Sequence, residues 1–285
     1  MLDSLVSFGQ YTWTALADAV IALIIPTVLF VGLALIMKRR EAWGAAKRAA
    51  HEARINLGYY FLDALFVVPV LGIVTVAIGV FMQNAGLILV PANWWLAIGT
   101  YPTLFLAVFL GDFIGYWRHR LEHTKWLWPT HAIHHSDEEM TWLTLNRFHP
   151  INRITTTIID SAFLMAMGLP AWAVIANSAV RNYYGYFIHA DLPWTYGPLG
   201  KVFVSPAMHQ WHHAKDIKYS GTNFATVFSI LDRVFGTFAL PGPCTVPLGI
   251  AQEIGTNVPA QLVHPFRAWF GPLFRKGGRS PETAP

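Results

Sequence analysis

Long apolar segments alternate with short polar ones in the first 120 residues of the chain. Residues 11–37, 57–82 and roughly 93–118 are each long enough to cross a bilayer, which takes about 20 apolar residues in a helix. Segment 38–56 carries six lysines and arginines, whereas segment 83–92 carries no charge. By the positive-inside rule the basic segment is cytoplasmic, so the third span ends on the cytoplasmic side.

The next apolar region, residues 154–188, is interrupted by Gly168-Leu169-Pro170. Each half is near or below the usual spanning length, which predicts a helical hairpin, either two short spans or a re-entrant pair. Beyond residue 189 the chain is polar and punctuated by glycine and proline, which predicts a cytoplasmic cap and a loose tail ending in GGRSPETAP. The expected fold is all-α and integral to the membrane, with three spans, the short hairpin and a helical cap.

Composition supports a membrane protein. Hydrophobic residues make up 54% of the chain and charged residues 13%, which is too apolar for an ordinary soluble domain. The net charge of +4 comes from basic residues beside apolar runs, which favours membrane lipids over nucleic acid as a partner. The single cysteine, Cys244, excludes an intrachain disulfide and cysteine-rich metal sites. We expect an inner-membrane protein of a bacterium, with its site facing the cytoplasm.

Histidines gather in two short windows, 119–135 and 209–213, which hold eight of the twelve in the chain. On a helix, residues three or four apart share a face, so each box aims its imidazoles in one direction. Eight imidazoles exceed one metal site, which predicts a dimetal site in the cap. Imidazole suits zinc, copper, iron and nickel alike, so spacing leaves the metal open. The eight are His119, His123, His131, His134, His135, His209, His212 and His213.

Five motifs within residues 108–240 carry a family resemblance: GDFIGYWRHRLEH, HAIHHS, RFHP, FIHADL and HQWHH, followed by GTNFATVFSILDRVFGTF. Together they resemble the fatty acid hydroxylase/sterol desaturase superfamily. The resemblance implies a membrane-bound non-haem oxygenase with two iron ions, for which zinc can substitute, and with O₂ as co-substrate. It implies that the eight box histidines are ligands and that His189 is a ninth.

The resemblance also bears on the branch and on further site residues. Gly185 stands where the fatty-acid 2-hydroxylase branch has a histidine, which argues against that branch. The alkylglycerol monooxygenase and sterol desaturase branches are closer, because D-x-x-x-Y-W-x-H-R and the ending Phe-Gly-Thr-Phe resemble theirs. Asn223 is placed either at the metals, directly or through water, or in a plain turn or cap. A ligand imidazole usually donates its second N–H to a carboxylate or carbonyl, which makes Asp112 a supporting candidate. His149 is assigned either to support of the ligands, which we favour, or to the start of the hairpin. Further carboxylate candidates are Glu122, Asp137, Glu138 and Asp232.

The expected reaction is hydroxylation or desaturation of a lipid or sterol-like alkyl chain in an apolar slot near Trp117, Phe163, Tyr186 and Phe187. No dinucleotide, haem or iron–sulfur motif is present, so electrons must come from a separate ferredoxin, cytochrome or reductase. We expect that donor to dock around Arg118, Arg120 and Lys125.

Three other functions stay open. A zinc-dependent membrane hydrolase would need one metal and a catalytic carboxylate that the boxes lack. A metal transporter would place polar ligands at mid-bilayer, and a metal-stabilised structural membrane protein is opposed only by the ligand count. The chain divides into spans with a basic linker (1–107), a catalytic region that includes the hairpin (108–240) and a C-terminal cytoplasmic tail (241–285).

Overall fold

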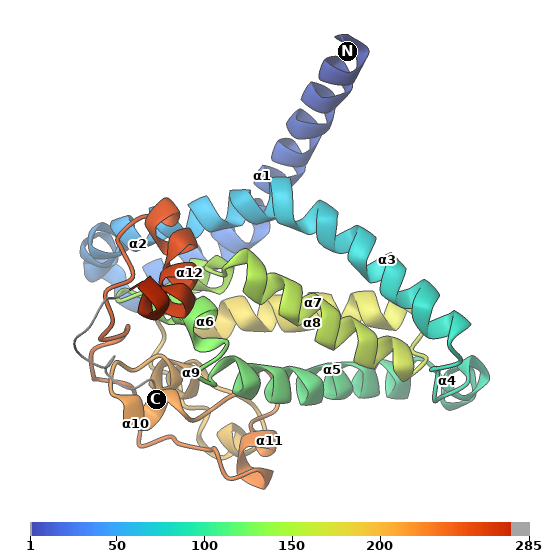
Figure 1. The fold of residues 1–285 in the computed structure, drawn as a ribbon. Helices are drawn as coiled ribbons and strands as arrows, with labels where there is room; N and C mark the ends of the chain where they lie inside the picture. The colour runs from blue at the N-terminus through green and yellow to red at the C-terminus, as the bar shows by residue number, and fades with distance from the viewer. Residues whose placement is uncertain (1, 275–285) are drawn as a thin grey trace.

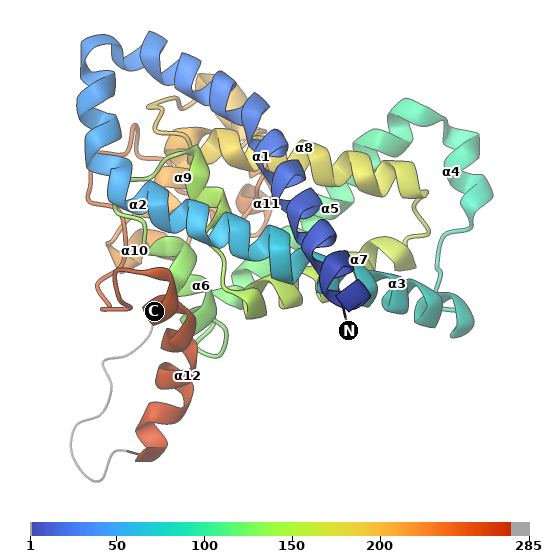
Figure 2. The same cartoon turned by 90° about the horizontal axis from the view of Figure 1, so that it is seen from above.

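The computed structural model describes residues 2–274, and within them the chain is helical, with one isolated β-bridge between Ala214 and Leu248. Figures 1 and 2 show the arrangement of the helices. The N-terminal helices are α1 (Leu2–Lys38), α2 (Ala42–Leu62), α3 (Val68–Asn84), α4 (Ala92–Ile98) and α5 (Thr100–Glu122). The others are α6 (Trp128–His135), α7 (Pro150–Ala166), α8 (Ala171–His189), α9 (Pro206–His212), α10 (Ile217–Ser220), α11 (Ser229–Val234) and α12 (Val258–Phe274). Short 3₁₀ turns cover Arg39–Glu41, Trp142–Asn146 and Gly197–Lys201.

The first three helices form one long helical path. A 3₁₀ turn at Arg39–Glu41 separates α1 from α2, and a π-helical turn at Asp63–Val67 joins α2 to α3. Within the described residues, Gln10–Asn84 is the one stretch that passes the length and apolarity test for a membrane crossing, and its most apolar part is mostly exposed. Apolar side chains that face outward rather than into a core suit contact with lipid. The number of spans stays a prediction.

The third predicted span is not continuous. Gly99 adopts φ 83°, which ends α4 and starts α5 in a new direction. The hydroxyl of Thr103 donates to the carbonyls of Trp95 and Gly99 and so closes this corner. A left-handed conformation is one that glycine adopts at little cost, and the apolar pattern of 93–118 carries no sign of it apart from that glycine.

The predicted hairpin is present as α7 and α8, joined by a turn in which Gly168 adopts φ 62°. Both helices pack against α5 (Figure 1). Gly111 and Gly115 lie four residues apart on α5, and a Cβ on them would collide with Asn177 and with the guanidinium of Arg181 on α8. The missing side chains therefore let α8 set polar groups directly against the backbone of α5, as small residues do at helix interfaces.

The cap gathers at the C-terminal end of α5. Figure 2 shows α2, α6, α9 and α12 at the end of the molecule opposite α4. Val258–Phe274, near the C-terminus, form α12, which packs on α6 and α2. The segment GGRSPETAP lies outside the described residues.

Candidate metal centre

Helix ends bring the nine histidines together. His119 lies in the last turn of α5 and His123 is its C-cap, while the second box forms the last turns of α6. His189 is the last residue of α8. The third box occupies α9 and its C-cap, His213. Ser205 is the N-cap of α9, and its hydroxyl accepts the N–H of Met208. Four elements from distant parts of the chain thus converge on one point.

The imidazoles form two adjoining groups. Within each group, one nitrogen from every ring lies within 4.8 Å of the others, so each group could hold a metal ion. The rings of His135 and His213 stack across the two groups with centroids 4.3 Å apart. The first group is His119, His123, His131, His135 and His212, and the second is His134, His189, His209 and His213.

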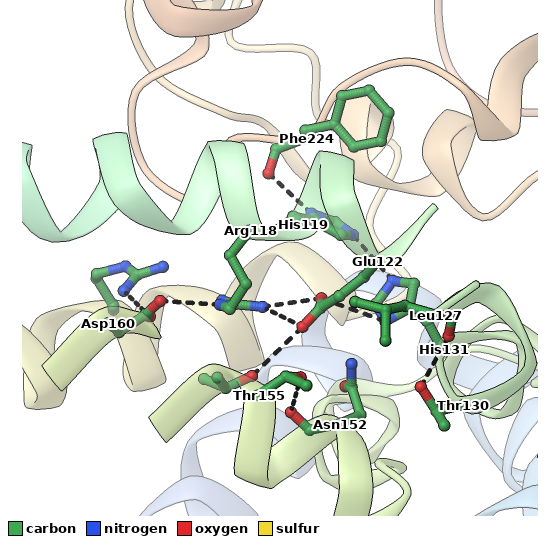
Figure 3. Close-up of polar contacts among 12 residues, drawn as sticks. Arg118, His119, Glu122, Leu127, Thr130, His131, Asn152, Thr155, Asp160 and Phe224 are labelled. Carbon is green, nitrogen blue, oxygen red and sulfur yellow. Dashed lines mark hydrogen bonds and ion pairs between the residues drawn. The ribbon is translucent and has the colours of Figure 1, made fainter. Parts of the chain in front are cut away.

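Backbone carbonyls fix the tautomers of three of these rings. His119 Nδ1 donates to the Phe224 carbonyl at 2.8 Å (Figure 3), and His212 Nδ1 donates to the Thr222 carbonyl at 2.6 Å. In each neutral ring Nε2 then carries a lone pair and no proton. The two Nε2 atoms nevertheless face each other at 3.0 Å. Two lone pairs at that distance repel each other unless a cation lies between them.

The second group repeats this arrangement. His189 Nδ1 donates to the Gly185 carbonyl at 2.7 Å, and its Nε2 lies 3.0 Å from His209 Nε2 and 3.1 Å from His134 Nε2. Two nitrogens at right angles on one ion, each about 2.1 Å from it, lie about 3.0 Å apart. The spacing of the nitrogens therefore fits ligands that share a metal ion.

The unpaired ring nitrogens and the burial of the rings also fit metal binding. Six of the nine rings have at least one buried nitrogen without a hydrogen-bond partner, and in His213 both nitrogens are unpaired. The six are His123, His131, His134, His135, His209 and His213. Burial lowers the pKa of all nine imidazoles, and neighbouring imidazoles lower most of them further. For His212 the pKa falls to about 3 and for His189 to about 4. The rings are thus held in the neutral form that binds metals.

Glu122 is the carboxylate beside the histidines. It is fully buried, and its Oε2 lies 3.5 Å from His131 Nδ1. Arg118 donates to both of its oxygens at 2.9 and 2.8 Å, and also to Asp160 at 2.9 Å (Figure 3). Burial raises the pKa of the Glu122 carboxyl, and Arg118 opposes that rise. A chain of charged groups therefore runs from α7 to His131.

Asp112, expected to support a ligand, acts through the backbone instead. Its oxygens accept the N–H groups of Thr226, Val227 and Phe228 at 2.9, 2.9 and 2.7 Å. In the same way, Asp232 accepts the N–H groups of Phe224 and Ala225, which directly precede Thr226 in this loop. The two carboxylates thus hold the loop in which the carbonyls of Thr222 and Phe224 accept hydrogen bonds from His212 and His119.

Asn223 has the turn role. It adopts φ 59°, its amide donates to the carbonyls of Met208 and Ala239, and its oxygen accepts the N–H of Ala239. The whole amide is thus engaged with backbone, which does not match a place at the metals.

His149 caps α7. Its Nδ1 accepts the N–H of Ile151 at 3.1 Å, and its Nε2 donates to the carbonyl of Leu262 in α12. Both ring nitrogens are used there, so the favoured support of the ligands is wrong. The other carboxylate candidates contact no histidine among the described residues: Asp137 binds Asn56 and Thr144, and Glu138 pairs with Lys215.

A cavity of about 340 Å³ between α5, α7 and α8 reaches both groups, with His119 and His131 of the first and His134, His189 and His209 of the second in its wall. The four aromatic residues expected to form an apolar slot do not line it, and most of its other side chains are polar. A second cavity of about 440 Å³ reaches His135 from the cap side, past Trp128 and Lys215.

Two cationic positions differ from expectation. Arg118 is buried in its ion pairs rather than exposed for a partner, whereas Arg120 and Lys125 are exposed. Arg181 was not singled out from the sequence, although a charged residue within the apolar run 171–188 was the available signal.

The structure thus defines a helical protein with two adjoining groups made of histidine alone. Residues 104–237 match the family model described as fatty acid hydroxylase. Similar curated proteins include ornithine lipid hydroxylase OlsE of Rhizobium tropici, with 30% identity over 62% of this chain and 53% of the relative. Alkylglycerol monooxygenase of Danio rerio shares 32% over 58% of this chain and 34% of its own length.

A third relative, very-long-chain aldehyde decarbonylase GL1-11 of Oryza sativa subsp. indica, shares 32% identity over 45% of this chain and 49% of its own. The chain therefore spans about a third to a half of these relatives. No solved structure matches it. Over residues 104–237, slightly less than half of its length, the chain is therefore similar to the fatty acid hydroxylase family.

Proposed function

We propose that the protein is a membrane-bound non-haem oxygenase that hydroxylates or desaturates the alkyl part of a lipid. The observation that carries the proposal is the ligand set: nine neutral imidazoles in two groups, seven of them buried and two partly buried, with no carboxylate in either group. Nitrogen ligands alone, five and four in number, suit two transition-metal ions. Two iron ions bound there would supply the activation of O₂ against an unreactive C–H bond.

The side chains of the protein do the rest. The nine histidines bind the ions, and the carbonyls of Thr222, Phe224 and Gly185 orient three of the rings. The cavity between α5, α7 and α8 admits substrate to both groups. The buried surroundings exclude bulk water from the reaction. Electrons come from a separate donor that docks on the cytoplasmic face, where Arg120 and Lys125 are exposed.

A hydrolytic reaction fits the site less well. A metal-dependent hydrolase needs a carboxylate that is free to take a proton from water. The nearest carboxylate, Glu122, is instead held by two hydrogen bonds from Arg118.

Metal analysis and turnover test the proposal. The purified protein, reconstituted anaerobically with ferrous ion, should bind about two irons per chain and form an oxidised lipid only with both O₂ and a reductant. His134→Ala should reduce bound iron and abolish product, because His134 belongs to the second group. His51→Ala is the matched control, since His51 is exposed on α2 and belongs to neither histidine group. One zinc per chain together with hydrolysis, or full activity of His134→Ala, would refute the proposal.

A further inference from the structure

The cavity that reaches both histidine groups has a mixed wall, in which polar side chains of α7 and α8 lie beside Leu145, Phe148 and Ile188. On α7 it is formed by hydroxyl and carboxylate side chains one turn apart, and on α8 by a hydroxyl, a guanidinium and an amide. An alkyl chain placed there would displace water from these groups and offer no hydrogen bond in return, which is unfavourable. The residues are Thr156, Thr157, Asp160 and Ser161 on α7, and Ser178, Arg181 and Asn182 on α8.

Arg181 has donors to spare. Among the described residues, its hydrogen bond is the one from Nη1 to Asp160 at 3.3 Å, and its Nε is buried without a hydrogen-bond partner, 3.8 Å from Asp112. A guanidinium carries five N–H donors. Arg118, by contrast, is held by three hydrogen bonds at 2.8–2.9 Å to Glu122 and Asp160. Arg181 therefore has N–H groups that can still bind an oxygen of a ligand, and so does Arg153, whose hydrogen bond is to Asp63.

The interface with α5 fixes the place of Arg181. Its guanidinium lies directly over Gly115, where a Cβ would collide with Nη2. One turn earlier on each helix, Asn177 lies over Gly111 in the same way. The glycine pair therefore positions Arg181 in the wall of the cavity rather than leaving it free to turn toward the surface.

The charges around the cavity define the kind of polar group it suits. Three guanidiniums, those of Arg118, Arg153 and Arg181, line it. They face Glu122 and Asp160 in the wall, while Asp63 and Asp112 pair with two of them from behind. Around Arg181, these three cations and four carboxylates leave no excess positive charge for a strongly anionic ligand, and the charge of bound metal ions would lie at the histidine end of the cavity. The hydroxyls and the amide add donors and acceptors without charge.

From these observations we propose that the cavity binds the polar headgroup of the lipid substrate, and that Arg181 donates to an oxygen of this headgroup. The headgroup is neutral or zwitterionic. The inference rests on the proposed function and adds the substrate class: a polar lipid whose headgroup occupies this cavity. Asn182 precedes His189 by seven residues, or about 10 Å along α8, so the oxidised carbon lies about that far from the bound headgroup.

Binding can be measured without turnover. Zinc-loaded protein in detergent is titrated with 1-O-hexadecylglycerol, which has a neutral headgroup, with lysophosphatidylcholine, which is zwitterionic, and with hexadecane and hexadecyl phosphate. A ligand of the folded state raises the unfolding temperature. We expect either or both of the first two to raise it and hexadecane to have no effect. An equal response to hexadecane, or a preference for the phosphate, would overturn the inference.

Variants locate the binding. Arg181→Gln should weaken the binding of the polar lipid at least tenfold, and Gly115→Ala should do the same by displacing the guanidinium. If Arg181→Gln does not fold, Ser178→Ala and Thr157→Val, which leave every ion pair intact, should each weaken binding several-fold. Arg48→Gln is the control, since Arg48 is exposed on α2 and outside the cavity. Unchanged binding in all the cavity variants would refute the assignment.

The two proposals fail in different ways. Binding of the polar lipid without any O₂-dependent product from iron-loaded protein would refute the oxygenase proposal but not the headgroup site. Oxidation of hexadecane as fast as of a polar lipid of equal chain length would refute the headgroup site but not the oxygenase proposal.

Discussion

The negative charge of Glu122 lies beside Nδ1 of His131 and stabilises this member of the first histidine group as a metal ligand. The carboxylate lies 3.5 Å from His131 Nδ1, and Arg118 holds it in place. Glu122→Gln keeps the shape and removes the charge. Loss of such a partner behind a metal ligand typically costs about 10–100-fold in metal affinity or activity. We therefore expect the variant to lose iron at a chelator concentration about tenfold lower than the parent protein does.

Glu138→Gln is the control for this measurement. Glu138 is exposed and pairs with Lys215 at 3.3 Å, so its neutral form should hold iron as the parent protein does. Equal chelator resistance of Glu122→Gln and the parent would show that the carboxylate only neutralises Arg118.

Spacing along the chain was sufficient to predict which histidines lie together. It was insufficient to predict the contacts of the polar residues around them. Repeated offsets of three and four residues aim rings to one side of a helix, so all eight box histidines lie where the pattern places them. Asn223 and His149 form their hydrogen bonds with backbone groups, such as the carbonyls of Ala239 and Leu262. A side chain's preference for a distant backbone carbonyl leaves no mark in the sequence pattern.

The loop after α10 is tied to α5 by Asp112, and this tie belongs to the scale of whole elements. Asp112→Asn replaces one acceptor oxygen by an amide, so at least one of the three N–H groups of residues 226–228 loses its partner. A buried unpaired donor costs about 1–3 kcal/mol. We expect the free energy of unfolding to fall by about that amount, and iron retention to fall with it, because the loop carries the carbonyls that orient His119 and His212.

Asp216→Asn provides the comparison for chemical or thermal unfolding. Asp216 also accepts a backbone N–H, at the start of α10, but it is exposed, and asparagine caps helices nearly as well. An Asp112→Asn protein as stable as Asp216→Asn would mean that the loop holds its position without the carboxylate.

Helix limits were predictable where the apolar pattern was long and failed where a local conformation intervened. α1 covers the predicted first span, and the predicted second span, 57–82, is divided among the end of α2, the π-helical turn and α3. Gly99 divides the third, because a positive φ cannot be read from an apolar run. α12 was missed because its sequence contains several prolines, yet its apolar side packs on α6 and α2. Tertiary packing can thus stabilise a helix that local propensity disfavours.

The histidine centre as a whole makes stability depend on pH. In the unfolded chain a histidine binds a proton below about pH 6.5, whereas in the fold burial lowers its pKa, to about 4 for His189 and about 3 for His212. The unfolded state then binds more protons, so the stability of metal-free protein falls as the pH falls from about 6.5 to about 4. Two carboxyls act the opposite way: burial raises the pKa of Asp232 to about 7 and that of Glu122. Nine histidines outweigh them.

Thermal unfolding of chelator-treated protein between pH 4.5 and 8 measures this balance. The unfolding temperature should be constant above about pH 7 and decrease steadily below pH 6.5, and acid should also release bound iron. An unfolding temperature that rises on acidification would show that the carboxyls dominate.

The orientation of the whole molecule in the membrane follows from its length and its charges. α5 has 23 residues, about 34 Å of helix, close to the thickness of a bilayer's apolar core. Its C-terminal end lies with the cap and with α2, and its other end lies with α4 (Figures 1 and 2). Because the six basic residues of segment 38–56 lie at the first of these ends, we predict from the positive-inside rule that this end faces the cytoplasm.

Single-cysteine labelling tests this orientation. In a Cys244→Ser background, cysteines replace Lys47 on α2 and Leu87 in the loop before α4, both of which are exposed. In intact bacterial cells whose outer membrane is permeable to it, a membrane-impermeant maleimide should label position 87 at once and position 47 only after the inner membrane is opened. Because the histidines lie at the end of α5 that adjoins α2, labelling of position 47 in intact cells would place the metal centre outside. A cytoplasmic electron donor could then not reach it.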